Sequence, residues 1–282
     1  MLKRNDESSV NAWFVLSIVG LGTCLSLLGD SSMYTVLPTH TADAAITLAA
    51  VGVMLSANRW IRLFTNGPAG WLSDRFSRRA IFIPALFLGA CSTLIYGLTS
   101  GYWPLLIGRL LWGISWSGIW ITGNAIVLDV STPENRGKLV GFYNVAFFSG
   151  AALGSFLGGW LTDLWGYSAA MRFEGMLTLA GAIIALLLLP ETKMLRPKID
   201  LIDQKNNDGD EKTAVMSGEF GSILALIGVN RFLIAGMLTP TFALLLQQTF
   251  QDEVTVFGRS MGVTTLTGLG ISFGFIFGWL VD

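Results

Sequence analysis

Long apolar runs alternate with short polar segments along almost the whole chain. Six runs come first, and two more follow a longer polar stretch. They occupy residues 12–38, 44–66, 80–99, 103–129, 140–163, 168–190, 231–250 and 260–280. Because a helix needs roughly 20 residues to cross a bilayer, the pattern predicts an all-α polytopic membrane protein with eight transmembrane helices. The first run is too long for the core of a signal peptide, so we expect it to be a retained helix.

Composition supports a lipid environment and excludes several classes of function. Charged residues make up 13% of the 282-residue chain, against about 25% in soluble domains. A net charge of -1 offers no basic excess for nucleic acid. One histidine and two cysteines provide neither a histidine metal cluster nor a disulfide scaffold. We therefore expect no cofactor and no metal.

The basic residues predict the orientation of the chain. With the N-terminus inside, the inner segments carry thirteen of them: Lys3, Arg4, Arg75, Arg78, Arg79, Arg136, Lys138, Lys193, Arg196, Lys198, Lys205, Lys212 and Arg231. The outer segments carry only Arg259. Since positive charge is retained on the cytoplasmic side, we expect a cytoplasmic N-terminus in the cell membrane. Arg59 and Arg62, near the inner end of the second run, are expected to reach the inner surface.

The polar stretch divides the chain into three predicted parts. Residues 1–190 form an N-terminal six-helix bundle, residues 191–230 a cytoplasmic linker with a possible surface helix, and residues 231–282 two helices of a second bundle. The block Gly278-Trp-Leu-Val-Asp282 repeats Gly70-Trp-Leu-Ser-Asp74 after the second run of each half, which suggests two related halves. On this reading the second half contains two of six helices, and we expect the intact protein to continue past Asp282.

Residues 70–79 carry a motif with the sequence Gly-Trp-Leu-Ser-Asp-Arg-Phe-Ser-Arg-Arg. It resembles the signature loop between helices 2 and 3 of the major facilitator superfamily, G-x-L-x-D-R-x-G-R-R. The matching residues are Gly70, Leu72, Asp74, Arg75, Arg78 and Arg79. Gly70 is expected to allow close helix approach, and Asp74 to accept hydrogen bonds where the third helix begins. Ser77 replaces a family glycine and is expected to strain the turn.

An acidic and a basic residue lie at matching depths in two predicted helices. Arg109 and Gly113 resemble the family's fourth-helix motif R-x-x-x-G. Arg109 is about 9 Å and Asp30 about 12 Å from the outer ends of their helices, at 1.5 Å per residue. The resemblance implies that helices 1 and 4 line the central cavity. We therefore predict that Asp30 and Arg109 form a protonation-sensitive pair. Glu174 and Arg172, by contrast, are expected at the outer interface.

Glycines recur on the fifth predicted helix. Gly150, Gly154 and Gly158 are spaced by four and share a face, and Gly159 follows directly. Residues 150–159 resemble the fifth-helix motif of superfamily antiporters, G-x-x-x-G-P-x-x-G-G, with Ser155 in place of the proline. The glycines are read either as close helix packing or as part of the antiporter motif.

Together the motifs predict a secondary transporter that moves a small molecule by alternating access, most simply as proton-coupled efflux by a monomer. The alternatives are an uptake symporter of the same superfamily, and a non-transporting truncated relative or sensor. An enzyme is not expected, since zinc-binding histidine motifs are absent from the sequence.

Overall fold

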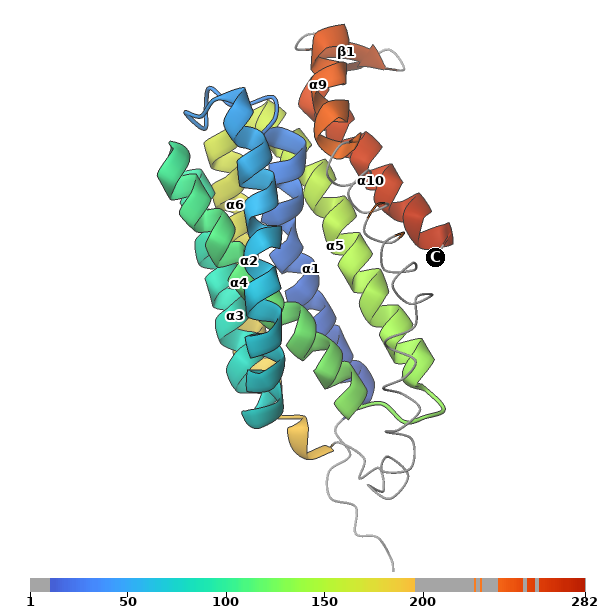
Figure 1. Cartoon of the computed structure of the whole chain (residues 1–282). Helices are drawn as coiled ribbons and strands as arrows, with labels where there is room; N and C mark the ends of the chain where they lie inside the picture. The colour runs from blue at the N-terminus through green and yellow to red at the C-terminus, as the bar shows by residue number, and fades with distance from the viewer. Residues whose placement is uncertain are drawn as a thin grey trace, which may run out of the picture.

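The computed structural model describes residues 11–195, 226, 229, 238–250, 253–256 and 259–281. These residues form a helical bundle (Figure 1). The helices are α1 (Ala12–Val36), α2 (Leu48–Arg75), α3 (Arg78–Leu98), α4 (Tyr102–Asp129), α5 (Arg136–Trp165), α6 (Tyr167–Leu188), η1 (Lys193–Leu195), α9 (Thr239–Phe250) and α10 (Val263–Val281). The six predicted runs of the first half are therefore all helical.

Local sequence explains where several helices begin and end. Asn11 caps α1 by accepting a hydrogen bond from the Trp13 N–H. Gly101 and Gly166 have φ values of 100° and 83°, a region that favours glycine. They allow the tight turns that join α3 to α4 and α5 to α6.

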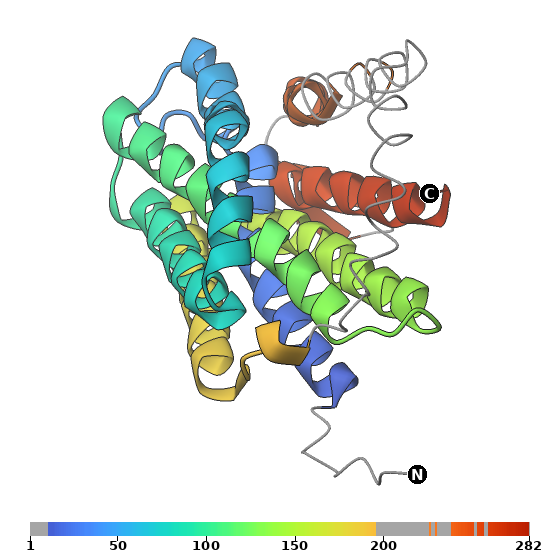
Figure 2. The ribbon, with the colours of Figure 1, turned by 60° about the horizontal axis from the view of Figure 1, so that its bottom comes forward.

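The first six helices pack mainly against helices that are not their neighbours in sequence. α1 lies against α5 and α6, α2 against α4, and α3 against α4 and α6. One core cluster joins α1, α3, α4, α5 and α6 around Leu16, Phe82 and Trp112. A second joins α1, α2, α3, α4 and α6 around Met33, Met54 and Tyr96. α10 packs on α5, and Figures 1 and 2 both show the two helices side by side.

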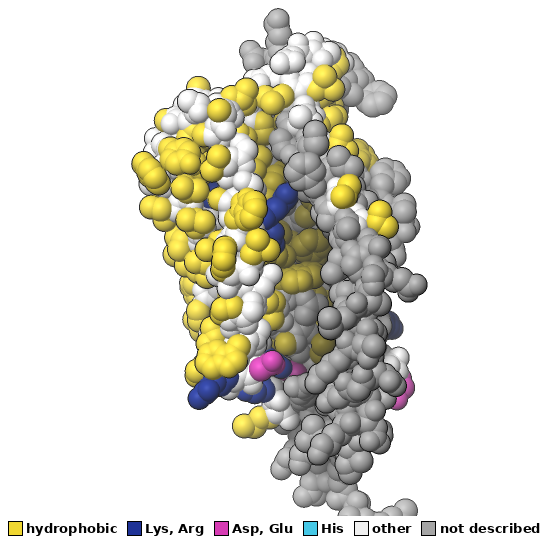
Figure 3. Space-filling model, in the orientation of Figure 1, with side chains coloured by type: hydrophobic (Ala, Val, Ile, Leu, Met, Phe, Trp, Pro, Cys, Tyr) yellow, Lys and Arg dark blue, Asp and Glu magenta, His cyan; other side chains and the backbone are white. Residues whose placement is uncertain are grey.

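Within the described residues, five helices are long and apolar enough to cross a membrane: α1, α3, α4, α5 and α6. α2 is less apolar because it includes Arg59, Arg62, Asp74 and Arg75. Apolar side chains cover much of the coloured face in Figure 3, and charged side chains appear partway along the bundle and at the end where α2 and α3 meet. Large residues such as Trp60, Phe64 and Leu187 are well exposed, as expected for a surface in lipid.

The second half departs from the expected helix boundaries. The predicted helix 231–250 is described only from residue 238, and residues 231–237 lie outside the described part. The predicted helix 260–280 begins at Val263, so its expected start is wrong. Instead, β1 (Glu253–Val256) pairs antiparallel with β2 (Arg259–Gly262), and β1 includes the β-branched residues Val254, Thr255 and Val256. Most of the linker 191–230 also lies outside the described residues.

Candidate functional site: a buried ion pair between α1 and α4

Asp30 on α1 and Arg109 on α4 form an ion pair. Nη1 of Arg109 lies 2.6 Å from Oδ1 of Asp30. The Arg109 side chain is fully buried, whereas the Asp30 side chain keeps 15% of its surface exposed. The predicted proximity of these two residues is therefore confirmed. The two residues are 79 positions apart in sequence.

α2 supplies further partners to the ion pair. The Arg109 Nε donates to the Met54 carbonyl at 3.0 Å. The Asn58 amide, on the next turn of α2, donates to Asp30 Oδ1 at 3.3 Å. Arg109 is thus also oriented by a backbone carbonyl, an acceptor that does not titrate. The sequence did not reveal this contribution, because a helix backbone carbonyl has no signature in the residue pattern.

Tyr34 packs beside the pair, one turn after Asp30. Its hydroxyl donates to the Leu55 carbonyl at 3.0 Å and accepts from the Arg109 Nη2 at 3.3 Å. The guanidinium carbons of Arg59 and Arg109 each lie 5.3 Å from the centre of its ring, within cation–π range. The expectation that Arg59 reaches the inner surface is wrong, because α2 extends to Arg75 and places Arg59 mid-helix.

The predicted signature loop is held by contacts that differ from those expected. Arg78 is buried, and its Nε donates to Asp129 Oδ2 at 2.8 Å. Asp74 is 77% exposed and lies 3.5 Å from Arg78; it does not serve as the acceptor where α3 begins. Ser77 has a φ of −68° and caps α3 through the Ala80 N–H, so the expected strain is absent. The serine is instead a good N-cap.

Glu191, just after α6, supplies the carboxylate at the start of α3. Its Oε1 accepts the N–H groups of Arg78 and Lys193, both at 3.0 Å, and its Oε2 accepts that of Arg79 at 3.3 Å. Burial alone would raise the pKa of Glu191, but these N–H groups and the Ser77 hydroxyl outweigh it and lower the pKa. These hydrogen bonds therefore attach the loop between α2 and α3 to the segment that follows α6.

Gly70 and Arg75 of the motif are less constrained. No described atom lies within 4 Å of a Cβ built on Gly70, so the expected close approach is not found among the described residues. Arg75 stacks over the ring of Trp71 at 5.3 Å. The Arg79 guanidinium donates to the Leu186 carbonyl, which gives a second link to α6.

The glycines of α5 face two different helices. A Cβ on Gly150, Gly154 or Gly158 would collide with α1, at Cys24, Leu28 and Ser32 respectively. A Cβ on Gly159 would instead collide with the Thr264 backbone of α10. On α4, a Cβ on Gly113 would meet Asn58 and Ile61 of α2. All five glycines therefore mark close helix contacts.

Two acidic residues have contacts that the sequence did not indicate. Glu174 is fully buried, so its expected interfacial position is wrong; it lies against Ser32 of α1. Arg172 is exposed, as expected for the interface. Asp163 of α5 accepts hydrogen bonds from the N–H and hydroxyl of Thr265, at 2.6 and 2.5 Å.

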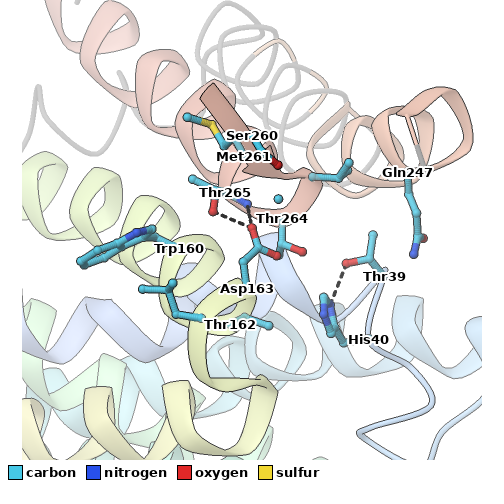
Figure 4. Close-up of a pocket in the computed structure, with 13 residues that line it drawn as sticks. Thr39, His40, Trp160, Thr162, Asp163, Gln247, Ser260, Met261, Thr264 and Thr265 are labelled. Carbon is cyan, nitrogen blue, oxygen red and sulfur yellow. Dashed lines mark hydrogen bonds between the residues drawn. The ribbon is translucent and has the colours of Figure 1, made fainter. Parts of the chain in front are cut away.

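A cavity of about 600 Å³ lies next to Asp163. Its wall combines the α1–α2 loop, the end of α5, α9, β2 and the start of α10 (Figure 4). Figure 4 shows the Asp163 carboxylate pointing toward Thr265, with His40 and Gln247 on the other side of the space. The cavity is separate from the Asp30–Arg109 pair, none of whose residues line it.

These features match a known family. The sequence profile of the Major Facilitator Superfamily matches residues 19–282. The chain belongs to the Major Facilitator Superfamily. The resemblance to this superfamily, drawn from the sequence motifs, is thereby confirmed. Because members of this superfamily are transporters, an enzymatic function is excluded.

Relatives within the superfamily include transporters with different named cargoes. The chain is 27% identical to Multidrug resistance protein 1 of Bacillus subtilis (strain 168), over 62% of this chain and 45% of the relative. It is 33% identical to a "Probable 4-methylmuconolactone transporter" of Cupriavidus pinatubonensis, over 44% of this chain and 29% of the relative. The chain thus spans less than half of the length of either relative.

Solved structures show the same fold. A bacterial homologue of the human lysosomal transporter Spinster, in an inward-facing and occupied conformation, superposes with a TM-score of 0.72. That match covers 94% of this chain and 60% of the homologue, at 17% sequence identity. A POT family transporter bound to a peptide conjugate gives a TM-score of 0.59 at 11% identity. The major facilitator fold expected from the sequence is therefore observed.

Proposed function

We propose that the protein exports a small molecule across the cell membrane by alternating access, in exchange for protons. Family membership supplies the transport class. Two relatives carry the name multidrug resistance protein, which favours efflux. The observation that carries proton coupling is the buried pair of Asp30 and Arg109, since ionisable residues inside a membrane bundle mark ion pathways.

The charge balance of this pair provides a mechanism. Asp30 as a carboxylate neutralises Arg109 and holds α1 to α4. A proton on Asp30 removes the attraction and leaves Arg109 with the Met54 carbonyl and the Tyr34 hydroxyl, on α2 and α1. The partial exposure of Asp30 gives water a route to its carboxyl group. Protonation from the outer side therefore weakens the α1–α4 contact and favours rearrangement of the bundle.

The proposed topology follows from the distribution of basic residues. The N-terminus is cytoplasmic. The start of α3, the end of α4 and the end of α6, which Arg78, Asp129 and Glu191 join, lie on the cytoplasmic side. Residues 1–190 act as the first bundle and residues 231–282 as helices of the second, joined by the linker 191–230. In this proposal the transporter acts as a monomer.

Transport in liposomes with an imposed pH gradient tests the coupling. A fluorescent cationic dye serves as the probe, and both directions of the gradient are applied, which separates antiport from symport. Asp30→Asn is expected to abolish pH-driven accumulation while keeping downhill dye exchange. Arg109→Ala is expected to impair both, because it leaves Asp30 without its cation.

Asp43→Asn is the matched control, because Asp43 is an exposed carboxylate in the α1–α2 loop. It is expected to behave as the unmodified protein. Full pH-driven accumulation by Asp30→Asn would show that coupling takes place elsewhere. Accumulation driven by the opposite gradient would establish uptake by symport.

A further inference from the structure

Glu174 is an acidic side chain buried at the junction of three helices. Its residue has no exposed surface. Oε1 of Glu174 on α6 lies 2.6 Å from the hydroxyl oxygen of Ser32 on α1. That same hydroxyl lies 2.8 Å from the Gly154 carbonyl oxygen on α5. Oε2 of Glu174 has no hydrogen-bond partner among the described residues.

The hydrogen count of this chain of contacts favours a protonated Glu174. A serine hydroxyl has one hydrogen to donate, and a carbonyl oxygen has none. If Glu174 is a carboxylate, Ser32 donates to only one of its two neighbours, and the other contact places two oxygens together without a hydrogen. If Glu174 is a carboxylic acid, it donates to Ser32, and Ser32 donates to Gly154. Only the second arrangement gives each short contact a hydrogen of its own.

The charges around Glu174 lead to the same conclusion. Among the described residues, none of the three ion pairs involves Glu174. The acidic side chains on the helices packed against α6 have other partners: Asp30 of α1 binds Arg109, and Asp163 of α5 binds Thr265. Their basic side chains are engaged or exposed elsewhere: Arg78 of α3 binds Asp129, Arg79 donates to the Leu186 carbonyl, Lys138 of α5 lies over the Trp13 ring, and Arg136 is exposed where α5 begins. Tyr96 of α3 bonds to Ser92, and Tyr143 of α5 to Thr23. On α6 itself, Arg172 is exposed and donates to the Ser168 carbonyl. An ionised Glu174 would therefore be a buried charge with no cation, which is strongly disfavoured.

We propose that Glu174 is a proton-binding site that stays occupied at neutral pH and joins α6 to α1 and α5. The bound proton completes the chain Glu174–Ser32–Gly154 across the three helices. One turn further along α6, Thr178 donates to the Leu25 carbonyl of α1 at 2.9 Å. This hydrogen bond is a second polar link between α6 and α1. Protonation of Glu174 depends neither on coupling at Asp30 nor on the direction of transport.

Loss of this proton requires the contact between α1, α5 and α6 around Glu174 to open. Gly158 lies so close to Ser32 that a Cβ there would collide with the Ser32 side chain, so the α5 backbone covers this side of the hydroxyl. Glu174 can ionise only when α1, α5 and α6 separate enough to hydrate it. Proton release at Glu174 is thus tied to a rearrangement of α1 against α5.

Infrared difference spectroscopy of the purified protein in lipid nanodiscs tests the proton directly. A protonated carboxylic acid has a carbonyl stretch that is well separated from the bands of a carboxylate and shifts in D₂O. We expect such a band at neutral pH in the unmodified protein and its loss in Glu174→Gln, whose amide copies the shape of the acid. Ser32→Ala should keep the band but move it to higher frequency, because it removes the hydrogen bond.

Thermal unfolding provides the second measurement. The folded protein retains a proton that the unfolded chain releases once the pH exceeds the ordinary range of a glutamic acid, so its stability falls as the pH rises. The melting temperature of Glu174→Gln should therefore rise relative to the unmodified protein between acidic and neutral pH. Asp43→Asn should show no such trend. Identical infrared spectra for the unmodified protein and Glu174→Gln, or a pH-independent difference in melting temperature, would overturn the assignment.

Discussion

Arg78 and Asp129 form a buried ion pair that joins the start of α3 to the end of α4. Nε of Arg78 lies 2.8 Å from Oδ2 of Asp129, and both side chains are at most 4% exposed. The Arg78 Nη1 also donates to the Ser73 hydroxyl at 2.9 Å. Asp74 lies farther from the same guanidinium and is mostly exposed. Within the signature loop, the buried interaction is therefore made by Arg78.

Arg78→Gln is expected to destabilise the protein more than Asp74→Asn. Removing Arg78 leaves Asp129 buried without a cation, a loss of about 3–5 kcal/mol in comparable cases. Asp74 contributes a surface contact of about 0–1 kcal/mol. Melting temperatures in detergent, at matched membrane expression, distinguish the two. A larger loss in Asp74→Asn would contradict this assignment.

The sequence predicted the fold well because hydrophobic run length is a strong signal in membrane proteins. Every run of the first half is a helix, although Leu48–Arg75 extends nine residues beyond the predicted end at 66. The extension was missed because Asp74 and Arg75 are charged and were assigned to a loop. The strands Glu253–Val256 and Arg259–Gly262 were missed because segments of four residues give no reliable periodicity.

The candidate site was only partly predictable. Opposite charges at equal depth identified Asp30 and Arg109, which are in contact. The same depth criterion would have identified Glu174, which lies seven residues into α6, or about 10 Å at 1.5 Å per residue. Glu191 lies outside the predicted helices. Its contact with α3 depends on how the end of α6 lies relative to the loop between α2 and α3. A contact of that kind needs the tertiary structure.

The contacts of Glu191 predict that its contribution to folding stability depends on pH. Because the N–H groups of Arg78, Arg79 and Lys193 lower its pKa, folding is stabilised above the ordinary glutamic acid pKa of about 4.3. This stabilisation is lost as the pH falls through the lower pKa of the folded state. Thermal unfolding from neutral to acidic pH should show a loss that is absent from Glu191→Gln. Matching pH profiles in the two proteins would argue against this role.

Gly154→Leu is expected to disrupt the contact between α1 and α5. A Cβ at Gly154 would lie 2.7 Å from the Leu28 carbonyl oxygen, so even a small side chain forces the helices apart. Overpacking of this kind typically costs about 1–3 kcal/mol. Gly141→Leu is the matched control on the same helix, since no described atom lies within 4 Å of a Cβ there.

Accessibility labelling shows whether Gly154→Leu affects insertion or rearrangement. Normal insertion with lost alternation between inward and outward labelling is the expected result, because membrane insertion depends on hydrophobicity and rearrangement depends on close packing. Gly141→Leu should retain both. Unchanged alternation in Gly154→Leu would mean that the tight contact has no part in the transport cycle.

Asp163 holds the start of α10 against the end of α5. Its Oδ2 accepts the N–H and hydroxyl of Thr265, which satisfies a backbone donor in the first turn of α10, and its negative charge suits that helix end. Asp163→Ala should weaken this attachment by about 1 kcal/mol.

Thr265→Val is the partial control, because it removes the hydroxyl and keeps the N–H. Spin labels at Leu164 and Met261, both beside the cavity, with Cys24 and Cys91 replaced by alanine, report the separation of α5 from β2, which leads directly into α10. The distance distribution should broaden strongly in Asp163→Ala and slightly in Thr265→Val, since the backbone hydrogen bond to the carboxylate survives in the second protein. Equal, narrow distributions in all three proteins would show that the glycine contacts of α5, and not this carboxylate, hold α10 in place.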